Sequence, residues 1–189
     1  MKYEINLLKL MIKIAILAML VVMGIHSFLS GLILVHQSSM NPTLEDGDML
    51  IVNKFIYIIS KPQVNDIVIL FRDDPTGIAT TRLGSTLKDY FKNMFNMEPT
   101  VRYVKRIVAT EGDIVDIKNG NLYINGELME EDFTIGKTYS NQGNFPQVIE
   151  PGYVFVLGDN REISLDSRRF GQVPIKNIES RVEYKLPSE

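Results

Sequence analysis

The fold class follows most directly from residues 114–124, IVDIKNGNLYI, in which two short apolar runs flank Asn119 and Gly120. Asn-Gly favours the positive φ angles of a type I′ turn, so this segment predicts a β-hairpin. Asn125 and Gly126 indicate another tight turn directly after it. Strands this short, with turns this frequent, are typical of an antiparallel sandwich or barrel.

Other segments on both sides of this hairpin are rich in β-branched and aromatic residues. The additional strand candidates are residues 49–59, 67–71, 101–109 and 153–157. Residues 85–96, STLKDYFKNMFN, differ from them, because their apolar side chains recur at the spacing of one helix face. We therefore expect a mainly β domain over residues 36–189, with a helix inserted at about 85–96.

The N-terminal segment has a different composition. Residues 14–35 form a run of 22 positions without Asp, Glu, Lys or Arg. As a helix this run would span about 33 Å, enough to cross a bilayer of roughly 30 Å. Lysines precede it at positions 2, 9 and 13, and no charged residue follows it until Glu45. The positive-inside rule then predicts a cytoplasmic N-terminus at 1–13, a transmembrane anchor at 14–35 and an extracytoplasmic domain after it.

A cleaved signal peptide is the alternative interpretation of this apolar run. The run is long for that role, and Phe28, Leu29 and Leu32 stand where a cleavage site requires small residues. A buried core helix fits less well, since the run is apolar on all faces. We expect an uncleaved anchor, with Gly31 as an alternative exit point that leaves residues 32–37 in an extended strand.

Composition excludes several classes of function. The 189 residues carry a net charge of −3, so no overall field favours nucleic acid. Cysteine is absent from the sequence, which excludes disulfides and thiol nucleophiles. Histidine occurs only at His26 and His36, too few for a histidine-rich zinc site. We expect neither a metal nor another cofactor.

Three short segments combine residue types that carry chemistry. They are 38–44 (SSMNPTL), 103–108 (YVKRIV) and 158–168 (GDNREISLDSR). In the first, Ser39 beside a Pro-Thr turn is weak evidence alone, because a turn serine often caps its own backbone. In the third, polar groups are denser after an apolar strand than packing alone requires, although a solvated loop with a surface ion pair is the alternative.

The second segment places a lysine on an apolar strand face. Alternation puts Lys105 on the side of Tyr103 and Ile107, with Arg106 pointing the other way. An edge-strand lysine that prevents aggregation is the alternative. Burial would lower the lysine pKa, and a shift from about 10.4 to near 7 corresponds to roughly 4–5 kcal/mol. Such a lysine can act as a neutral base.

Together with the N-terminal run, the three segments resemble the conserved boxes of the bacterial type I signal peptidases. The family pattern Ser-Met-x-Pro-Thr-Leu matches residues 39–44, and its Tyr-x-Lys-Arg strand matches 103–106. Its Gly-Asp-Asn-Arg-x-x-Ser-x-Asp-Ser-Arg run matches 158–168 without a gap. The resemblance covers nearly the whole chain and is greatest to the short, single-span form common in Gram-positive bacteria.

The resemblance implies a signal-peptidase/LexA-like catalytic domain of coiled antiparallel sheets. It implies a serine endopeptidase that removes signal peptides at the outer face of the bacterial cytoplasmic membrane. Ser39 would be the nucleophile, Lys105 the neutral general base and Ser164 a hydrogen-bonding residue that orients this lysine. The implied partners are signal peptides of secreted preproteins, the lipid bilayer and a secretion translocon nearby.

The remaining candidates support or shape the same site. Asp166 is expected to tie the last loop to neighbouring arginines, with Arg106 and Arg168 as the candidates. The residues expected at the oxyanion or substrate site are Gln37, Met40 and Tyr103. Gln37 stands where some members of the family have an oxyanion-hole serine, so its side-chain amide is the candidate second donor beside the Ser39 amide.

Three other functions are less consistent with the sequence. A Ser-His-Asp hydrolase needs a histidine base, but His26 lies in the apolar run and His36 would point away from Ser39 on a continuous strand. A LexA-type self-cleaving repressor would carry a DNA-binding segment and no transmembrane run. A non-catalytic, signal-peptidase-like pilus assembly factor would be expected to lack the serine or the lysine, and both are present.

Overall fold

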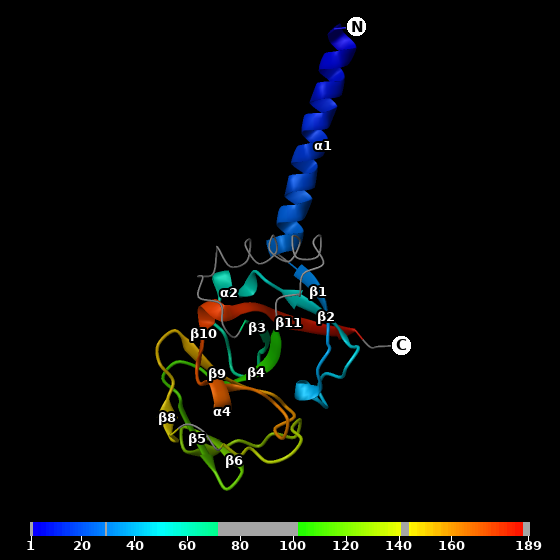
Figure 1. Ribbon diagram of the computed structural model, residues 1–189. Coiled ribbons are helices and arrows are strands. Elements are labelled where there is room, and N and C mark those ends of the chain that lie inside the picture. Colours follow the sequence, from blue (N-terminus) through cyan, green and yellow to red (C-terminus); the bar gives the residue numbers. More distant parts are fainter. Residues whose placement is uncertain (1, 29, 72–101, 141–143, 187–189) are drawn as a thin grey trace.

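The computed structural model describes residues 2–28, 30–71, 102–140 and 144–186. It consists of an N-terminal helix, α1 (Lys2–Phe28), and two antiparallel β-sheets. Figure 1 shows α1 projecting from one end of the β domain, with β5 (Ile114–Lys118) and β6 (Asn121–Ile124) at the opposite end. The mainly β fold that the sequence predicts is confirmed.

The larger sheet has seven strands in the order β1-β2-β11-β3-β4-β9-β10. Their bounds are β1 (Ser30–Leu34), β2 (Met49–Asn53), β3 (Ile67–Leu70), β4 (Tyr103–Ala109), β9 (Tyr153–Leu157), β10 (Val173–Pro174) and β11 (Ile178–Leu186). All neighbouring pairs in this sheet are antiparallel. The strand β4 pairs with β3 on one side and β9 on the other, so it is an internal strand.

The smaller sheet has the order β7-β6-β5-β8, with β7 at Glu127–Leu128 and β8 at Gln147–Val148. Its central hairpin is formed as the sequence predicts. Asn119 and Gly120 have φ angles of 54° and 78°, and β5 pairs with β6 directly on either side of them. Positive φ at both central residues is the signature of a type I′ turn.

Four short helices connect these strands in the described part of the chain. They are η1 (Ser38–Met40), α2 (Ile56–Ile59), α4 (Ser167–Phe170) and η2 (Ile175–Asn177). The prediction of one long strand over 49–59 is wrong, because the strand ends at Asn53 and α2 follows. The Asn53 side-chain oxygen accepts hydrogen bonds from the backbone N–H groups of Phe55 and Ile56, which turns the chain out of the sheet. The helix predicted at 85–96 lies outside the described residues.

The predicted boundary of the N-terminal anchor requires a correction. Residues 14–35 are not one helix, because α1 ends at Phe28 and β1 occupies Ser30–Leu34. The cause is the partner strand β2, which pairs with β1 from Ser30↔Asn53 to Leu34↔Met49. None of the helices in the described residues combines the length and the hydropathy that crossing a membrane requires.

A buried apolar cluster fixes the segment between β1 and β2 against the larger sheet. It consists of Val35, Met40, Leu44, Leu50, Val52 and Ile69. Val35 precedes Ser39 in the chain and Met40 follows it, so the cluster holds the backbone of this turn on both sides.

Candidate active site

The structure brings Ser39 and Lys105 together. Ser39 lies in η1, and Lys105 lies in the middle of β4, 66 residues further along the chain. Lys105 Nζ donates a hydrogen bond of 2.7 Å to Ser39 Oγ and one of 2.9 Å to the Val104 carbonyl oxygen. The amine is therefore within reach of the serine proton, which is the geometric requirement for a base. We call these two side chains the dyad.

Lys105 is buried in the interior of the larger sheet. Its side chain is only 1 % exposed, and β4 has a neighbour on each side. Desolvation lowers the pKa of Lys105 from 10.5 to about 8, while Asp166 and Asp159 act to raise it and Arg168 acts to lower it. Lys105 is not an edge lysine that prevents aggregation, because β4 is an internal strand. Its burial lowers the pKa enough for a neutral amine to be present near physiological pH.

The turn that carries Ser39 is held from two directions. Met40 points into the apolar cluster behind the turn, and the Leu44 N–H donates to the Met40 carbonyl oxygen at 2.9 Å. On the other side, the Asn160 N–H donates to the Ser39 carbonyl oxygen at 3.1 Å. The second contact joins the serine turn directly to segment 158–168.

Arg106 pairs with Asp159 and not with Asp166. The guanidinium makes two hydrogen bonds to the Asp159 carboxylate, Nε at 2.9 Å and Nη2 at 2.7 Å. Asp159 also accepts a hydrogen bond of 2.6 Å from the Thr43 hydroxyl, in the serine turn. Neither Asp159 nor Thr43 was predicted as a site residue. The sequence did point to Asp159, since it lies two residues after the apolar strand β9 and a buried carboxylate requires a partner.

Asp166 pairs with Arg168, which is one of its two candidate partners. Its carboxylate accepts hydrogen bonds from Arg168 Nε at 2.9 Å and Nη2 at 2.8 Å, and from the Gly158 N–H at 3.1 Å. Its side chain also caps the first turn of α4 through the Arg168 N–H. The alternative pairing with Arg106 is wrong, because Arg106 lies on the Asp159 side of the loop. Asp166 is fully buried, so this network fixes Gly158 from inside the domain.

Ser164 lies beside the dyad, but its hydroxyl makes no hydrogen bond to any described residue. The hydrogen bond to Lys105 implied by the resemblance is therefore not formed in this structure. Ser164 packs closely on Gly158, where an added Cβ would come within 2.2 Å of Ser164 Oγ and 2.5 Å of the Ser39 carbonyl oxygen. A side chain at position 158 would push these groups apart, so the close approach requires glycine.

An open cleft of about 670 Å³ lies in front of the dyad. Gln37 and Tyr103 line it, as the sequence predicts, together with Ile163 and Leu165, which were not singled out. The Gln37 side chain is exposed and makes no hydrogen bond to another described residue, so its role as an oxyanion donor stays a prediction.

A smaller, apolar hollow of about 250 Å³ lies next to this cleft. Met40, Ile33 and Val104 line it, and Ser39 lines both spaces. Met40 therefore lies where it could contact a substrate side chain next to the scissile bond. The hollow is lined mainly by apolar side chains, so it suits an apolar substrate side chain.

Histidine and metal chemistry find little support in the described residues. His36 lines the cleft, but no hydrogen bond joins it to Ser39 in this part of the chain. No group of three or more His, Asp or Glu side chains that could hold a metal ion occurs among the described residues. The Lys105 amine is thus the base that the geometry offers to Ser39.

Comparison with known proteins identifies relatives of this chain. A family model described as "Signal peptidase, peptidase S26" matches residues 8–186. Thylakoidal processing peptidase 1 of Arabidopsis thaliana is 39% identical over 149 residues, which are 78% of this chain and 39% of that protein. Signal peptidase I of Bacillus caldolyticus is 32% identical over an alignment 189 positions long, which covers 89% of this chain and 85% of that protein.

The extent of these matches differs between relatives. The chain spans about two fifths of the Arabidopsis protein and most of the Bacillus protein. A crystal structure of a signal peptidase I from Enterococcus faecalis aligns at 25% identity with a TM-score of 0.42, covering 66% of this chain and 99% of that one. Because the family model spans nearly the entire sequence, the chain belongs to the signal peptidase family, peptidase S26.

Proposed function

We propose that this chain is a signal peptidase I. It removes signal peptides from secreted preproteins at the outer face of the bacterial cytoplasmic membrane, near the secretion translocon. The observation that carries the proposal is the 2.7 Å contact between Ser39 Oγ and a buried lysine amine. The alternative of a non-catalytic pilus assembly factor is not favoured, because such a protein has no need for a desolvated lysine at hydrogen-bonding distance from a serine.

In the proposed mechanism, neutral Lys105 is the general base. As Ser39 Oγ attacks the scissile carbonyl carbon, its proton passes to Lys105 Nζ, and the carbonyl oxygen becomes an oxyanion. Lys105 then gives this proton to the leaving amine nitrogen, which breaks the peptide bond and leaves an acyl ester on Ser39. A water molecule, deprotonated by the now neutral lysine, attacks the ester carbon. The bond to Ser39 Oγ then breaks, Lys105 returns the proton to Oγ, and the acyl part leaves as a carboxylic acid.

The developing oxyanion needs hydrogen-bond donors close to Ser39. The backbone N–H of Ser39 is one, and we assign the Gln37 side-chain amide as the second. Two contacts support a preorganised backbone at this point: the apolar anchoring of Met40 and the Asn160–Ser39 hydrogen bond. A turn fixed in this way requires no reorganisation when negative charge develops.

The remaining residues of the site act through the dyad. Arg106 and Asp159 hold the Thr43 end of the serine turn, and Arg168 and Asp166 hold Gly158 on the other side. We assign Ser164 as a positioning residue for Lys105, since it lies against Gly158 and its hydroxyl is available as an acceptor.

We further propose that α1 anchors the chain in the bilayer, with residues 1–13 inside and the catalytic domain outside. The described large apolar side chains between Leu7 and Val22 are 49–63 % exposed, so no other described element covers them. A helix with exposed apolar side chains on every face is more stable in lipid than in water, because lipid tails surround these side chains. The anchor then lies close to Ser39 in sequence, which keeps the cleft near the membrane surface.

The pH dependence follows from the lowered pKa of Lys105. We expect kcat/KM to rise about ten-fold between pH 7 and pH 9, because the neutral fraction of an amine with a pKa of about 8 rises from about one tenth to about nine tenths. Between pH 8 and about 10.4 the unfolded chain binds this proton more tightly, so stability should also rise with pH there. Initial rates on a peptide without ionisable side chains measure the profile, and a flat profile from pH 6 to 9.5 would contradict a lysine base.

Substrate specificity follows from the apolar hollow. A substrate bound as an extended strand presents its first and third residues before the cut to the same face. Because the chain belongs to the signal peptidase family, we expect alanine at both positions to be preferred over leucine by at least about ten-fold in kcat/KM, with the hollow beside Met40 binding one of these side chains. Matched peptides that differ only at one of these positions provide the measurement, with leucine at the second position as the control. Equal cleavage of the leucine peptides would show that the hollow does not bind these side chains.

The proposed function is tested by cleavage with the detergent-solubilised full chain. We expect a preprotein or peptide with an Ala-x-Ala site to be cut after the second alanine, as determined by mass spectrometry of both products. The Ser39→Ala variant, prepared in parallel, controls for contaminating proteases. Absence of cleavage by the wild-type chain, with no difference from Ser39→Ala, would favour a non-catalytic role.

A further inference from the structure

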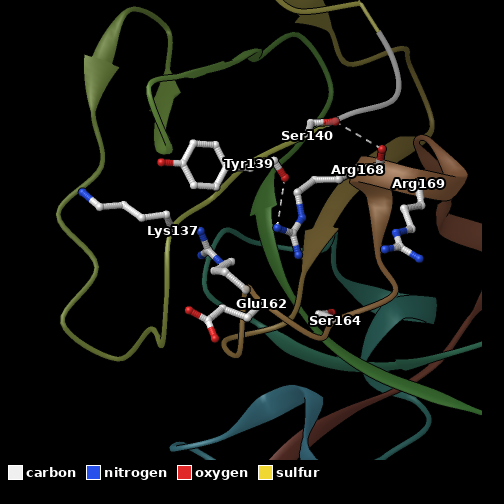
Figure 2. A pocket seen from close by; sticks show the side chains of 8 residues that line it. Lys137, Tyr139, Ser140, Glu162, Ser164, Arg168 and Arg169 are labelled. Carbon is white, nitrogen blue, oxygen red and sulfur yellow. Dashed lines mark hydrogen bonds between the residues drawn. The ribbon is translucent and has the colours of Figure 1, made fainter.

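A second cavity lies behind the catalytic cleft. It has a volume of about 580 Å³ and is bounded by the segment around Lys137 and by the segment 161–169, which we call the strap (Figure 2). Strap residues alternate between the two spaces. Ile163 and Leu165 line the catalytic cleft, whereas Glu162 and Ser164 line the second cavity. A ligand in this cavity would therefore contact the back of the wall whose front faces the dyad.

Two buried arginines from the strap contribute donors to this cavity. Arg161 uses three N–H groups, toward the Gly158 carbonyl, the Thr138 hydroxyl and the Glu131 carboxylate. The Arg168 side chain also uses three, two toward Asp166 and one toward the Tyr139 carbonyl. A guanidinium has five N–H groups, so each arginine keeps two that make no hydrogen bond to the described residues.

Two further cations at the cavity have no acidic partner in the part of the chain that the structure describes. Within the described ranges, no hydrogen bond or ion pair joins the side chain of Lys137 or Arg169 to another residue, although both line the cavity. In the view of Figure 2, the guanidinium groups of Arg168 and Arg169 both lie above Ser164. Glu162 is the acidic residue in the lining. Glu131 and Asp166 pair with the two strap arginines, so four cations stand against three carboxylates, and the excess positive charge comes from Lys137 and Arg169.

The Ser164 hydroxyl is an independent indication of a ligand. The residue is 6 % exposed and lines the cavity, yet its Oγ has no hydrogen-bond partner among the described residues. A buried hydroxyl without a partner is unfavourable, and a hydroxyl can donate one hydrogen bond while it accepts others. Ser164 can therefore donate to an anion in this cavity while its lone pairs stay available to a donor.

We propose that this cavity binds the phosphate group of a small, free anionic ligand, held by Arg169, the unused N–H groups of Arg168 and the Ser164 hydroxyl. Guanidinium forks match phosphate oxygens, and donors from several directions suit a tetrahedral oxyanion better than a planar carboxylate. A free ligand is favoured over a lipid headgroup, because Figure 1 shows α4, which carries Arg168 and Arg169, well removed from α1.

Binding has a consequence for the dyad, which rests on the proposed function. The charged groups that act on Lys105 are Asp166, Asp159 and Arg168. An anion next to Arg168 offsets the effect by which this arginine lowers the lysine pKa. The bound anion therefore raises the pKa of Lys105, and we expect the rate on the acidic side of the profile to fall roughly two- to five-fold. Above pH 9.5 the rate is unaffected, since the amine is neutral in both states.

The first test measures binding without catalysis, using the full chain in detergent with the Ser39→Ala substitution. We expect inorganic phosphate, compared with chloride at equal ionic strength, to raise the melting temperature and to give a saturable calorimetric isotherm. The double variant Lys137→Gln/Arg169→Gln should bind phosphate at least ten-fold more weakly, whereas Lys176→Gln, which removes an exposed lysine elsewhere, should bind normally. Equal binding by all three chains would overturn the proposal, and so would the same effect with chloride.

The second test compares sources of the phosphate group and reads the coupling to catalysis. Inorganic phosphate should lower the rate at pH 7.5 and leave it unchanged at pH 9.5 in the wild-type chain and Lys176→Gln, but not in the double variant. Micelles containing phosphatidylglycerol should give no effect that depends on Arg169. An effect seen only with this lipid would overturn the free ligand. Because binding is measured in a chain without Ser39, failure of the protease function would not be mistaken for failure of this site.

Discussion

Replacement of Lys105 by methionine is expected to lower kcat about 10²–10⁴-fold, the usual contribution of a positioned general base, while the protein stays folded. The amine is the group within hydrogen-bonding distance of Ser39 Oγ, so its loss leaves the hydroxyl without a proton acceptor. Methionine is apolar and of similar length, and Lys105 is 1 % exposed, so the substitution removes a costly buried amine. Melting temperature should therefore be maintained or raised.

Two companion variants separate the base from mere burial. Lys105→Arg should be inactive as well, because a guanidinium stays protonated at neutral pH and cannot accept the serine proton. Ser39→Ala should reduce cleavage to background, since the nucleophilic oxygen is removed. Lys176→Met, at an exposed lysine outside the site, controls for general effects of losing a lysine. Substantial activity of Lys105→Met without an added amine would exclude the lysine-base mechanism, and unfolding of this variant would show that the amine is structural.

Features with a local cause could be predicted from the sequence. The hairpin at Asn119 and Gly120 depends on two φ angles that this dipeptide adopts readily, so it formed where expected. The strand at 153–157 also has the predicted bounds, because its apolar run is bounded by turn residues on both sides. The contact between Ser39 and Lys105 was expected only from the resemblance to the signal peptidases, since 66 residues separate the two side chains.

Features decided by distant partners could not be predicted in the same way. Apolarity alone made residues 30–34 part of the anchor, but pairing with β2 places them in the sheet. The choice of Arg168 over Arg106 as the partner of Asp166 depends on which side of the loop each guanidinium reaches. Asp159 was overlooked because its partners Arg106 and Thr43 come from two other segments of the chain. In each case the free energy comes from a tertiary contact that no local pattern encodes.

The largest effect on stability is expected from Asp166→Ala. This carboxylate is fully buried and accepts hydrogen bonds from the Arg168 side chain and from the Gly158 N–H. Its removal leaves a buried guanidinium without its charge partner, which costs about 3–5 kcal/mol. In a protein of this size we expect the melting temperature to fall by roughly 6–20 °C, measured by circular dichroism or calorimetry.

A matched pair of controls shows whether the unpaired charge is the cause. Lys61→Ala breaks the ion pair with Glu111, in which Lys61 is 83 % exposed, and should leave the melting temperature nearly unchanged. The double variant Asp166→Ala/Arg168→Met removes both charges and should recover much of the lost stability, because no unpaired buried charge remains. If Asp166→Ala melts like the wild type, the carboxylate is not coupled to the fold in the way these hydrogen bonds indicate.

The same substitution should change catalysis in a direction that loss of stability alone would not produce. Asp166 acts to raise the pKa of Lys105, and Arg168 acts to lower it. Without the carboxylate, the effect that raises the pKa is lost and the lowering effect of Arg168 remains. The amine is then neutral at lower pH, so the pH–rate profile of Asp166→Ala should shift to lower pH. Its maximal rate should nevertheless fall, because Gly158, which touches the Ser39 carbonyl and Ser164, loses the partner of its N–H. A profile with an unchanged midpoint would show that Asp166 supports the loop without acting on Lys105, whereas a shift to higher pH would contradict the electrostatic role assigned to the pair.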